Sequence, residues 1–149
     1  MPELPEVEVT RLGLKPLLKL KVGKVIIRNH SLRWPINSAL PELLKNQMLL
    51  DLSRRGKYIL AKFTSGTLII HLGMSGRLCI VSIGNELNKH DHVDIHFMKK
   101  NLILRYRDPR RFGSILWTEN DPYIHKLIKN LGPEPLKDEF DAKYLFSRL

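Results

Sequence analysis

The segment at residues 58–72 reads YILAKFTSGTLIIHL, in which two mainly apolar runs flank the dipeptide Ser65-Gly66. Each run has the length and the β-branched and aromatic content of a strand. A short connection that contains glycine is typical of a turn between antiparallel strands. We therefore predict a β-hairpin here.

Further strands are expected on both sides of the hairpin. The segment HVDIHF at residues 92–97 alternates polar and apolar residues, which places Val93, Ile95 and Phe97 on a buried face. Turn signals separate it from other short apolar runs, at residues 24–28, 49–54, 77–81, 102–106 and 114–117. Many short strands at this spacing predict an α+β, mainly β fold: an antiparallel two-sheet β-sandwich or barrel-like domain.

Helices are expected to flank the strands. Apolar residues at helical spacing predict an N-terminal helix over roughly residues 5–18, weakened at its far end by Gly13 and Pro16. A short helix is expected near residues 38–45, with Ser38 as its cap. C-terminal helices are predicted at residues 124–131 and 138–149. No linker divides the chain, so residues 1–149 are predicted to form one domain.

Composition narrows the class of protein. The chain has 149 residues and 43% hydrophobic residues, which suits one globular domain. No apolar run approaches the roughly 20 residues of a membrane helix, and the N-terminus is acidic where a signal peptide would be basic, so we expect a cytoplasmic protein. The single cysteine, Cys79, excludes an intrachain disulfide and is expected to be a small core residue.

The net charge of +10 favours a polyanionic partner, which could be DNA, RNA or an anionic membrane surface. The cations cluster in two segments that contain glycine, SRRGKY at residues 53–58 and RYRDPRRFG at residues 105–113. Backbone at a glycine can approach a phosphate closely, and arginine fits phosphate oxygens. A solvated turn is the alternative for the first segment, and neutralisation of the arginines by Asp108 is the alternative for the second.

Two loops carry side chains that could enter distorted DNA. The segment HLGMSG at residues 71–76 places Met74 between two glycines, where a flexible thioether could act as a wedge between bases, or could simply fill the core. Phe112 precedes Gly113 in the second cationic segment and could protrude as a stacking residue. With the two basic loops, these features indicate a surface for distorted DNA.

The segment KHDHVD at residues 89–94 raises a metal hypothesis, because two histidines and two aspartates lie close together. On a strand that begins at His92, His92 and Asp94 share one face, whereas His90 lies in the preceding loop. No third ligand is evident, so we predict no metal site and favour a histidine that contacts phosphate.

The N-terminal segment MPELPEVE offers a different kind of chemistry. Removal of Met1 would leave the secondary amine of Pro2 next to the carboxylate of Glu3. An α-amino group titrates near pH ~7.7–8.0, so much of it is nucleophilic under physiological conditions. Such an amine can attack an electrophilic carbon while a carboxyl group moves protons. The alternative is that Pro2 to Pro5 form only a stiff entry to the first helix.

Taken together, these motifs make the chain resemble the N-terminal catalytic domain of bacterial formamidopyrimidine-DNA glycosylase. The segments that carry the resemblance occur in order along the chain: PELPEVE (2–8), RRGKY (54–58), HLGMSG (71–76), KHDHVD (89–94), DPRRFG (108–113) and LGPEPL (131–136). The resemblance implies base-excision repair, with removal of oxidised purines such as 8-oxoguanine and formamidopyrimidines and lyase cleavage at the abasic site.

The resemblance also implies roles for individual residues. Pro2 matches the nucleophile that forms a Schiff base, Glu3 matches the proton donor, and Lys57 matches the residue assigned to β-elimination. The residues that match positions for filling the gap left by the flipped nucleotide, or for other DNA contacts, are Met74, Arg110, Phe112, His90 and Arg111. We add Glu6 as a supporting residue.

Family members are nearly twice as long as this chain. The helix–two-turn–helix module and the zinc finger of the family are expected to be absent from residues 1–149, so no cofactor is expected here. The expected partner is double-stranded DNA with oxidised purines or abasic sites, and the expected form is a monomer in the bacterial cytoplasm, associated with the nucleoid and not with a membrane. Two alternatives stay open: a truncated, catalytically weak domain that binds damaged DNA, and a glycosylase for pyrimidine lesions of the endonuclease VIII type.

Overall fold

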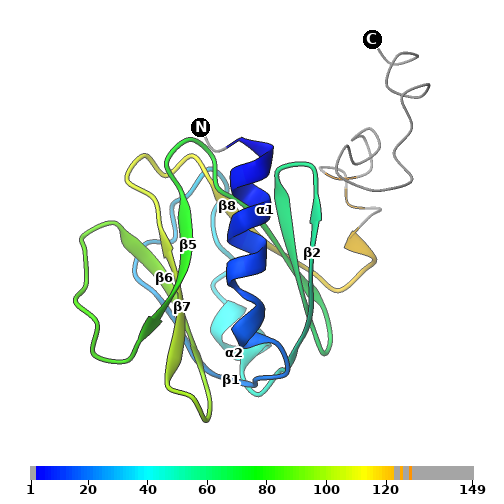
Figure 1. Ribbon diagram of the computed structural model, residues 1–149, viewed down its shortest axis with the longest axis vertical. Coiled ribbons are helices and arrows are strands. Elements are labelled where there is room, and N and C mark those ends of the chain that lie inside the picture. The colour runs from blue at the N-terminus through cyan, green and yellow to red at the C-terminus, as the bar shows by residue number, and fades with distance from the viewer. Residues whose placement is uncertain (1–2, 123–124, 126–127, 129–149) are drawn as a thin grey trace.

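The computed structural model describes residues 3–122, His125 and Ile128, and its architecture is a sandwich of two antiparallel sheets (Figure 1). The first sheet has the strand order β1-β6-β7-β5, and the second has the order β2-β3-β4-β8. The strands are β1 (Val22–Ile27), β2 (Leu49–Arg55), β3 (Tyr58–Phe63), β4 (Thr67–His71), β5 (Arg77–Ser82), β6 (Asp91–Phe97), β7 (Leu102–Arg107) and β8 (Ser114–Thr118). The predicted fold class is confirmed, and every predicted strand is present within two residues of its expected bounds.

The predicted hairpin is β3 and β4. The amide of Phe63 donates to the carbonyl oxygen of Gly66 at 2.7 Å, and the register then pairs Tyr58 with His71 at the other end of the hairpin. Gly66 lies against the ring of Trp117 on the neighbouring strand β8, where a Cβ atom would collide with the indole. Close packing against Trp117 therefore requires glycine at this position, and the short turn favours it as well.

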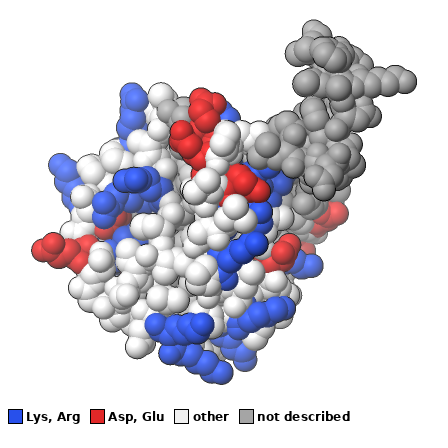
Figure 2. Space-filling model, viewed as in Figure 1, with Lys and Arg blue, Asp and Glu red and all other residues white. Residues whose placement is uncertain are grey.

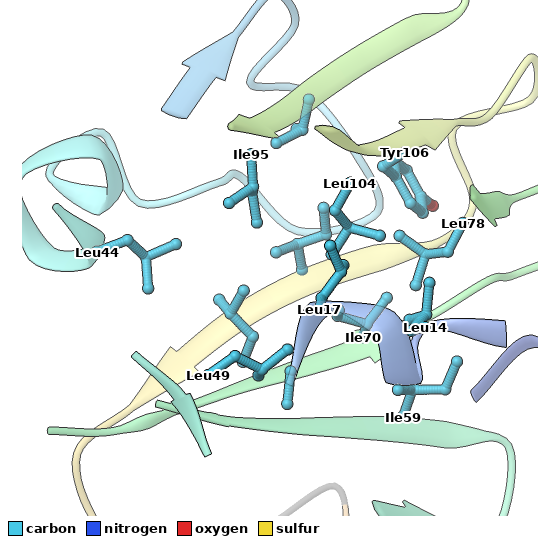
Figure 3. Close-up of a cluster of buried hydrophobic side chains, with 14 of the residues drawn as sticks. Leu14, Leu17, Leu44, Leu49, Ile59, Ile70, Leu78, Ile95, Leu104 and Tyr106 are labelled. Atoms are coloured by element: carbon cyan, nitrogen blue, oxygen red, sulfur yellow. The ribbon is translucent and has the colours of Figure 1, made fainter. Parts of the chain in front are cut away.

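The core lies between the two sheets, where leucine and isoleucine side chains from facing strands interdigitate (Figure 3). Helix α1 (Leu4–Gly13) packs across the opening between β5 and β2, as Figure 1 shows. It contributes Val7 to the core, and Leu14 and Leu17 follow directly after it. These three side chains are almost fully buried, so the apolar stripe predicted for the N-terminal segment is what fixes the helix on the sandwich.

The predicted N-terminal helix ends earlier than expected. The α-helix stops at Gly13, and residues Lys15–Leu17 form a separate 3₁₀ turn, η1, that contains Pro16. Gly13 has low helix propensity and proline cannot continue the α-helical hydrogen bonds. The α-helix is therefore followed by a tighter 3₁₀ turn. Lys19 then adopts a left-handed φ of 72° and turns the chain toward β1.

Two smaller predictions are wrong. The short helix is α2 (Leu40–Leu44), and Ser38 does not cap it: Ala39 is the N-cap residue, and the Asn37 side chain accepts from the Ala39 amide at 2.9 Å. Cys79 is exposed instead of buried. It lies on β5, an edge strand, and the neighbouring Leu78 is the side chain that points into the core.

The alternating strand β6 is buried on both faces. Val93, Ile95 and Phe97 lie in the core as predicted, but His92 and Asp94 are buried as well. The outer face of this sheet holds an ion-pair network instead of solvent. The pairs join Asp94 to Arg28 and Arg105, at 2.8 and 2.9 Å, and Asp91 to Arg107, at 2.6 Å.

This network makes stability depend on pH. Burial alone would raise the pKa of Asp94, but hydrogen bonds and charge from Arg105 and Arg28 hold that pKa below its usual value, and Arg107 and the Asn88 amide do the same for the pKa of Asp91. A lowered folded-state pKa contributes stability at every pH above the unfolded value of about 3.9, and that contribution is lost as the pH falls further.

We expect the free energy of unfolding, measured by urea titration, to fall steeply below about pH 4. Asp94→Asn should lower it by about 3 kcal/mol at pH 7, because the buried Arg105 and the more exposed Arg28 lose their partner. Glu119→Gln is the control, since this exposed side chain forms no ion pair within the described residues. Equal stability of the Asp94 and Glu119 variants at pH 7 would contradict the assigned role of the network.

The predicted C-terminal helices lie outside the described residues, apart from two positions. Ile128 is buried against Leu60 and Ile69, on the face of the second sheet that points away from the core. None of the helices in the described part of the chain has the length and apolarity needed to cross a membrane.

Candidate functional site

The start of helix α1 brings together two of the predicted catalytic residues. Glu3 is the N-cap residue of α1, and its carbonyl oxygen accepts from the amides of Glu6 and Val7 at 3.0 and 3.1 Å. The exposed Glu3 carboxylate lies 3.8 Å from the ammonium group of Lys57. Pro2, the predicted nucleophile, lies outside the described residues. Pro2 directly precedes Glu3 in the chain, so the residue next to Pro2 carries the carboxylate that lies near the Lys57 ammonium group.

Lys57 is held near α1 by a buried guanidinium group. Arg54 lies at the end of β2 and donates to the carboxylate of Glu8 at 3.2 Å and to the carbonyl oxygen of Gly56 at 3.0 Å. Arg11 donates to the same carboxylate at 2.6 Å, and hydrogen bonds from Arg11 and then Arg54 lower the pKa of Glu8 despite its partial burial. The helix and the β2–β3 turn are therefore fixed to each other through ionised groups.

Asp108 organises the loops that carry the predicted wedge residues. Its carboxylate is fully buried and accepts four hydrogen bonds, from the Ser75 and Tyr106 hydroxyl groups, both at 2.7 Å, and from the backbone amides of Arg111 and Gly113, at 3.0 and 2.9 Å. These contacts join the β4–β5 loop at residues 72–76 to the β7–β8 loop at residues 108–113. We call these two segments the wedge loops.

The wedge loops also pack backbone against backbone. Gly73 has a φ of 61°, and a Cβ atom there would collide with Phe112 and Gly113 of the other loop. Met74 and Phe112 are nevertheless 44% and 46% exposed, although both are large apolar side chains. The guanidinium group of Arg110 lies over the Phe112 ring at 5.3 Å. The closely packed backbone of the wedge loops thus presents two apolar side chains and one cation to solvent. Proteins that insert side chains between stacked bases use apolar side chains of this kind.

The two histidines of the KHDHVD segment have different surroundings. His92 is buried, and its Nε2 lies 2.8 Å from the carbonyl oxygen of Asp108, so that nitrogen donates. His90 is only partly buried, and its carbonyl oxygen accepts from the Asp108 amide at 3.0 Å. The structure therefore attaches the predicted phosphate-contacting histidine to the wedge loops. Within the described residues, no group of three or more His, Cys, Asp or Glu side chains could hold a metal ion.

A pocket of about 440 Å³ next to the wedge loops involves residues to which the sequence assigned no role. Its lining includes Tyr58, His71, Arg33 and Trp34, together with Met74 and Phe112. The Tyr58 and His71 rings are 4.8 Å apart, and the Gly73 amide donates to Nδ1 of His71 at 3.0 Å. Burial, followed by the nearby charges of Lys57 and Arg33, lowers the pKa of His71. The sequence could have indicated this pair, because the register of the hairpin places Tyr58 and His71 opposite each other, beside the first basic segment.

A second hollow, a groove of about 830 Å³, runs beside helix α1 and β5. Its lining includes Glu6 and Thr10 from the helix and Met74 and Ser75 from the wedge loops. Glu6, predicted as a supporting residue, therefore shares this groove with Met74. Arg110 and Arg111 are exposed at the neighbouring loop. Glu3, Glu6, Lys57, His90 and the wedge residues thus lie at or beside one end of the sandwich, which we call the wedge end.

Comparison with known proteins identifies the family. Residues 1–115 match the family model described as the formamidopyrimidine-DNA glycosylase N-terminal domain. The chain belongs to the formamidopyrimidine-DNA glycosylase family. The formamidopyrimidine-DNA glycosylase of Methylobacillus flagellatus is 54% identical over 145 residues, which cover 97% of this chain and 52% of the relative. The enzyme of that name from Saccharophagus degradans is 53% identical over 149 residues, which cover 99% of this chain and 55% of the relative.

A solved structure from the same family has the same fold as this chain. The formamidopyrimidine-DNA glycosylase of Lactococcus lactis, solved non-covalently bound to DNA that contains an abasic site, superposes with a TM-score of 0.84 at 31% identity. That match covers 99% of this chain and 57% of the Lactococcus chain. The chain spans about half the length of the curated glycosylases it matches.

Proposed function

We propose that this chain is the N-terminal catalytic domain of a DNA glycosylase that removes oxidised purines and then cleaves the abasic strand as a lyase. The observation that supports this most strongly is the position of the Glu3 carboxylate, 3.8 Å from the Lys57 ammonium group at the start of α1, directly after Pro2 in the sequence. The wedge loops and the half-buried His90 lie nearby and suit a duplex from which one nucleotide has been flipped. The proposed partner is DNA that contains 8-oxoguanine, formamidopyrimidine or an abasic site.

The proposed reaction starts at the amine of Pro2. The amine attacks C1′ of the flipped nucleotide, the glycosidic bond breaks, and the base leaves with the bonding electrons while the Glu3 carboxyl group donates a proton. The C1′–O4′ bond of the sugar ring then breaks, O4′ takes up a proton, and the proline nitrogen, now without its own proton, forms an iminium with C1′. The iminium makes the C2′ proton acidic, and its removal breaks the C3′–O bond and cleaves the strand. Lys57 is the proposed residue for this elimination.

Binding in this proposal divides into two parts. Arg110, Arg111 and His90 bind the DNA, with Arg110 facing the base opposite the lesion, while Met74 and Phe112 occupy the space that the flipped nucleotide leaves. Unstacking costs a few kcal/mol, and preformed wedge contacts help offset that cost. Glu6 supports the site from the groove beside α1. The protein is proposed to act as a monomer in the bacterial cytoplasm, on DNA of the nucleoid.

The test is cleavage of matched duplexes that differ only in the lesion. We expect the chain to incise a duplex with 8-oxoguanine faster than one with an oxidised pyrimidine by at least roughly tenfold, a difference that base-specific contacts can supply. A preference for the pyrimidine lesion would replace the proposal with an activity of the endonuclease VIII type. Tight binding without incision of either duplex would favour a domain that only recognises damaged DNA.

A further inference from the structure

The end of the sandwich opposite the wedge end carries a second cationic surface. Hydrogen bonds between backbone groups tie three segments together there: the Met98 amide donates to the carbonyl oxygen of Lys21 at 2.8 Å, and the Asn46 amide donates to that of Val22 at 2.9 Å. We call this surface the lysine end. Its cations are Lys19, Lys21, Lys45, Lys99 and Lys100, all exposed.

The charges of the lysine end are not neutralised within the fold. Among the described residues, none of its five ammonium groups forms an ion pair with a carboxylate. In Figure 2, blue side chains line the lower edge of the molecule, where Figure 1 places the β6–β7 turn and the start of β1. A concentration of one sign of charge creates a potential that attracts polyanions from solution.

The backbone at two of these lysines is strained. Lys19 and Lys99 have φ values of 72° and 75°, in the left-handed region that glycine adopts readily and that a lysine adopts only at a cost. Asn46 and Asn101, in the adjoining turns, also have positive φ, of 67° and 54°, but asparagine tolerates this conformation better. A charged residue therefore occupies two positions where glycine would fold more easily, which points to a use for the charge.

The chemistry of the surface selects one kind of partner. Its cations are lysines on three separate loops, point charges without the fork of arginine, and such charges suit phosphates of any sequence. The apolar side chain beside them is Met98, which is 37% exposed, and no aromatic side chain accompanies it among residues 18–22, 45–48 and 98–101. A membrane surface would be held by a larger apolar area as well as by charge.

We propose that the lysine end binds the phosphodiester backbone of a second DNA duplex while the wedge end holds the first. The two surfaces lie at opposite ends of the strands, so one duplex need not displace the other. The protein could then pass directly from one duplex to a neighbouring one. This inference rests on the DNA binding proposed above for the wedge end, but it concerns undamaged DNA and does not depend on the proposed catalytic chemistry.

Direct transfer has a kinetic signature. The chain is loaded on a fluorescent, undamaged duplex, and its dissociation is followed by anisotropy at increasing concentrations of unlabelled duplex. We expect the dissociation rate to rise in proportion to competitor for the natural sequence. In the double variant Lys19→Gly/Lys99→Gly the slope should fall by roughly tenfold, the size of a strong electrostatic contribution to association. The rate without competitor should change less than twofold.

The matched control is Asn46→Gly/Asn101→Gly, which relieves the same backbone strain and removes no charge. Both double variants should raise the melting temperature, by roughly 2–6 °C, but only the lysine variant should lose transfer. A competitor-independent rate in the natural sequence, or equal slopes in the two variants, would overturn the inference. So would equally lysine-dependent binding to phosphatidylserine vesicles, which would indicate a membrane partner. Failure of lesion incision with transfer intact would reject the proposed function alone.

Discussion

Asp108→Asn is expected to lower the free energy of unfolding by about 3 kcal/mol and to lower excision of 8-oxoguanine from duplex DNA by about 100-fold. The buried carboxylate accepts from two hydroxyl groups and two amides. An asparagine in its place would turn an NH₂ group toward at least one donor. The wedge loops would separate, and Met74 and Phe112 would lose the fixed spacing at which they can occupy the gap in the duplex.

The experiment distinguishes a loss of positioning from a loss of chemistry. An abasic site in single-stranded DNA needs no flipping, so cleavage of that substrate by the Asp108 variant should stay within about threefold of the natural sequence, whereas the duplex substrate shows the full loss. Asp51→Asn is the matched control, since it makes the same change at an exposed position on β2. Equal losses on both substrates would show that Asp108 does not act through the wedge loops.

A milder change tests the same connection if the Asp108 variant fails to fold. Ser75→Ala removes one of the four donors and also the hydroxyl group that accepts from the Arg110 amide at 3.0 Å. It should cost about 1 kcal/mol of stability and lower duplex excision more than single-strand cleavage. Ser82→Ala, at the exposed end of β5, is the control.

The sheets could be predicted because their signals are local. Short apolar runs, separated by glycine or polar turns, determine where the strands lie, and the turn at Ser65-Gly66 sets the register of the hairpin. The predicted helix extends beyond the observed end of α1, because Gly13 and Pro16 each only weaken a helix in the sequence. The length of the helix depends on which side chains reach the core. Cys79 was misplaced because an apolar run on an edge strand can expose alternate side chains.

The predicted wedge residues are brought together by Asp108, for which neutralisation of the neighbouring arginines was one of the interpretations of the sequence. Asp108 sits among arginines in the sequence, yet its carboxylate bonds to hydroxyl groups and amides from loops far apart along the chain. Such a network depends on tertiary structure, so no local pattern reveals it. The sequence could not reveal the pairing of Asp94 with two arginines for the same reason. A strand alternates polar and apolar residues in the same way whether its polar face is buried or solvated.

Capture of the abasic sugar by Pro2 is the second large effect that we expect. A Schiff base needs a free amine, so any residue retained before Pro2 converts its nitrogen to an amide and should abolish covalent trapping, a loss of at least roughly 1,000-fold. The nearest alternative nucleophile is Lys57, whose ammonium group lies beside Glu3. Lys57→Arg keeps the positive charge and removes this amine, so trapping should persist in that variant.

The most direct measurement is borohydride reduction of the chain mixed with DNA that contains an abasic site, followed by mass spectrometry of the linked peptide. One preparation carries a removable N-terminal tag, and the other has had the tag cleaved to leave Pro2 first. We predict a covalent complex only after cleavage, with the DNA remnant on Pro2. Trapping of the tagged chain, or a remnant on Lys57, would contradict the assignment of Pro2 as the nucleophile.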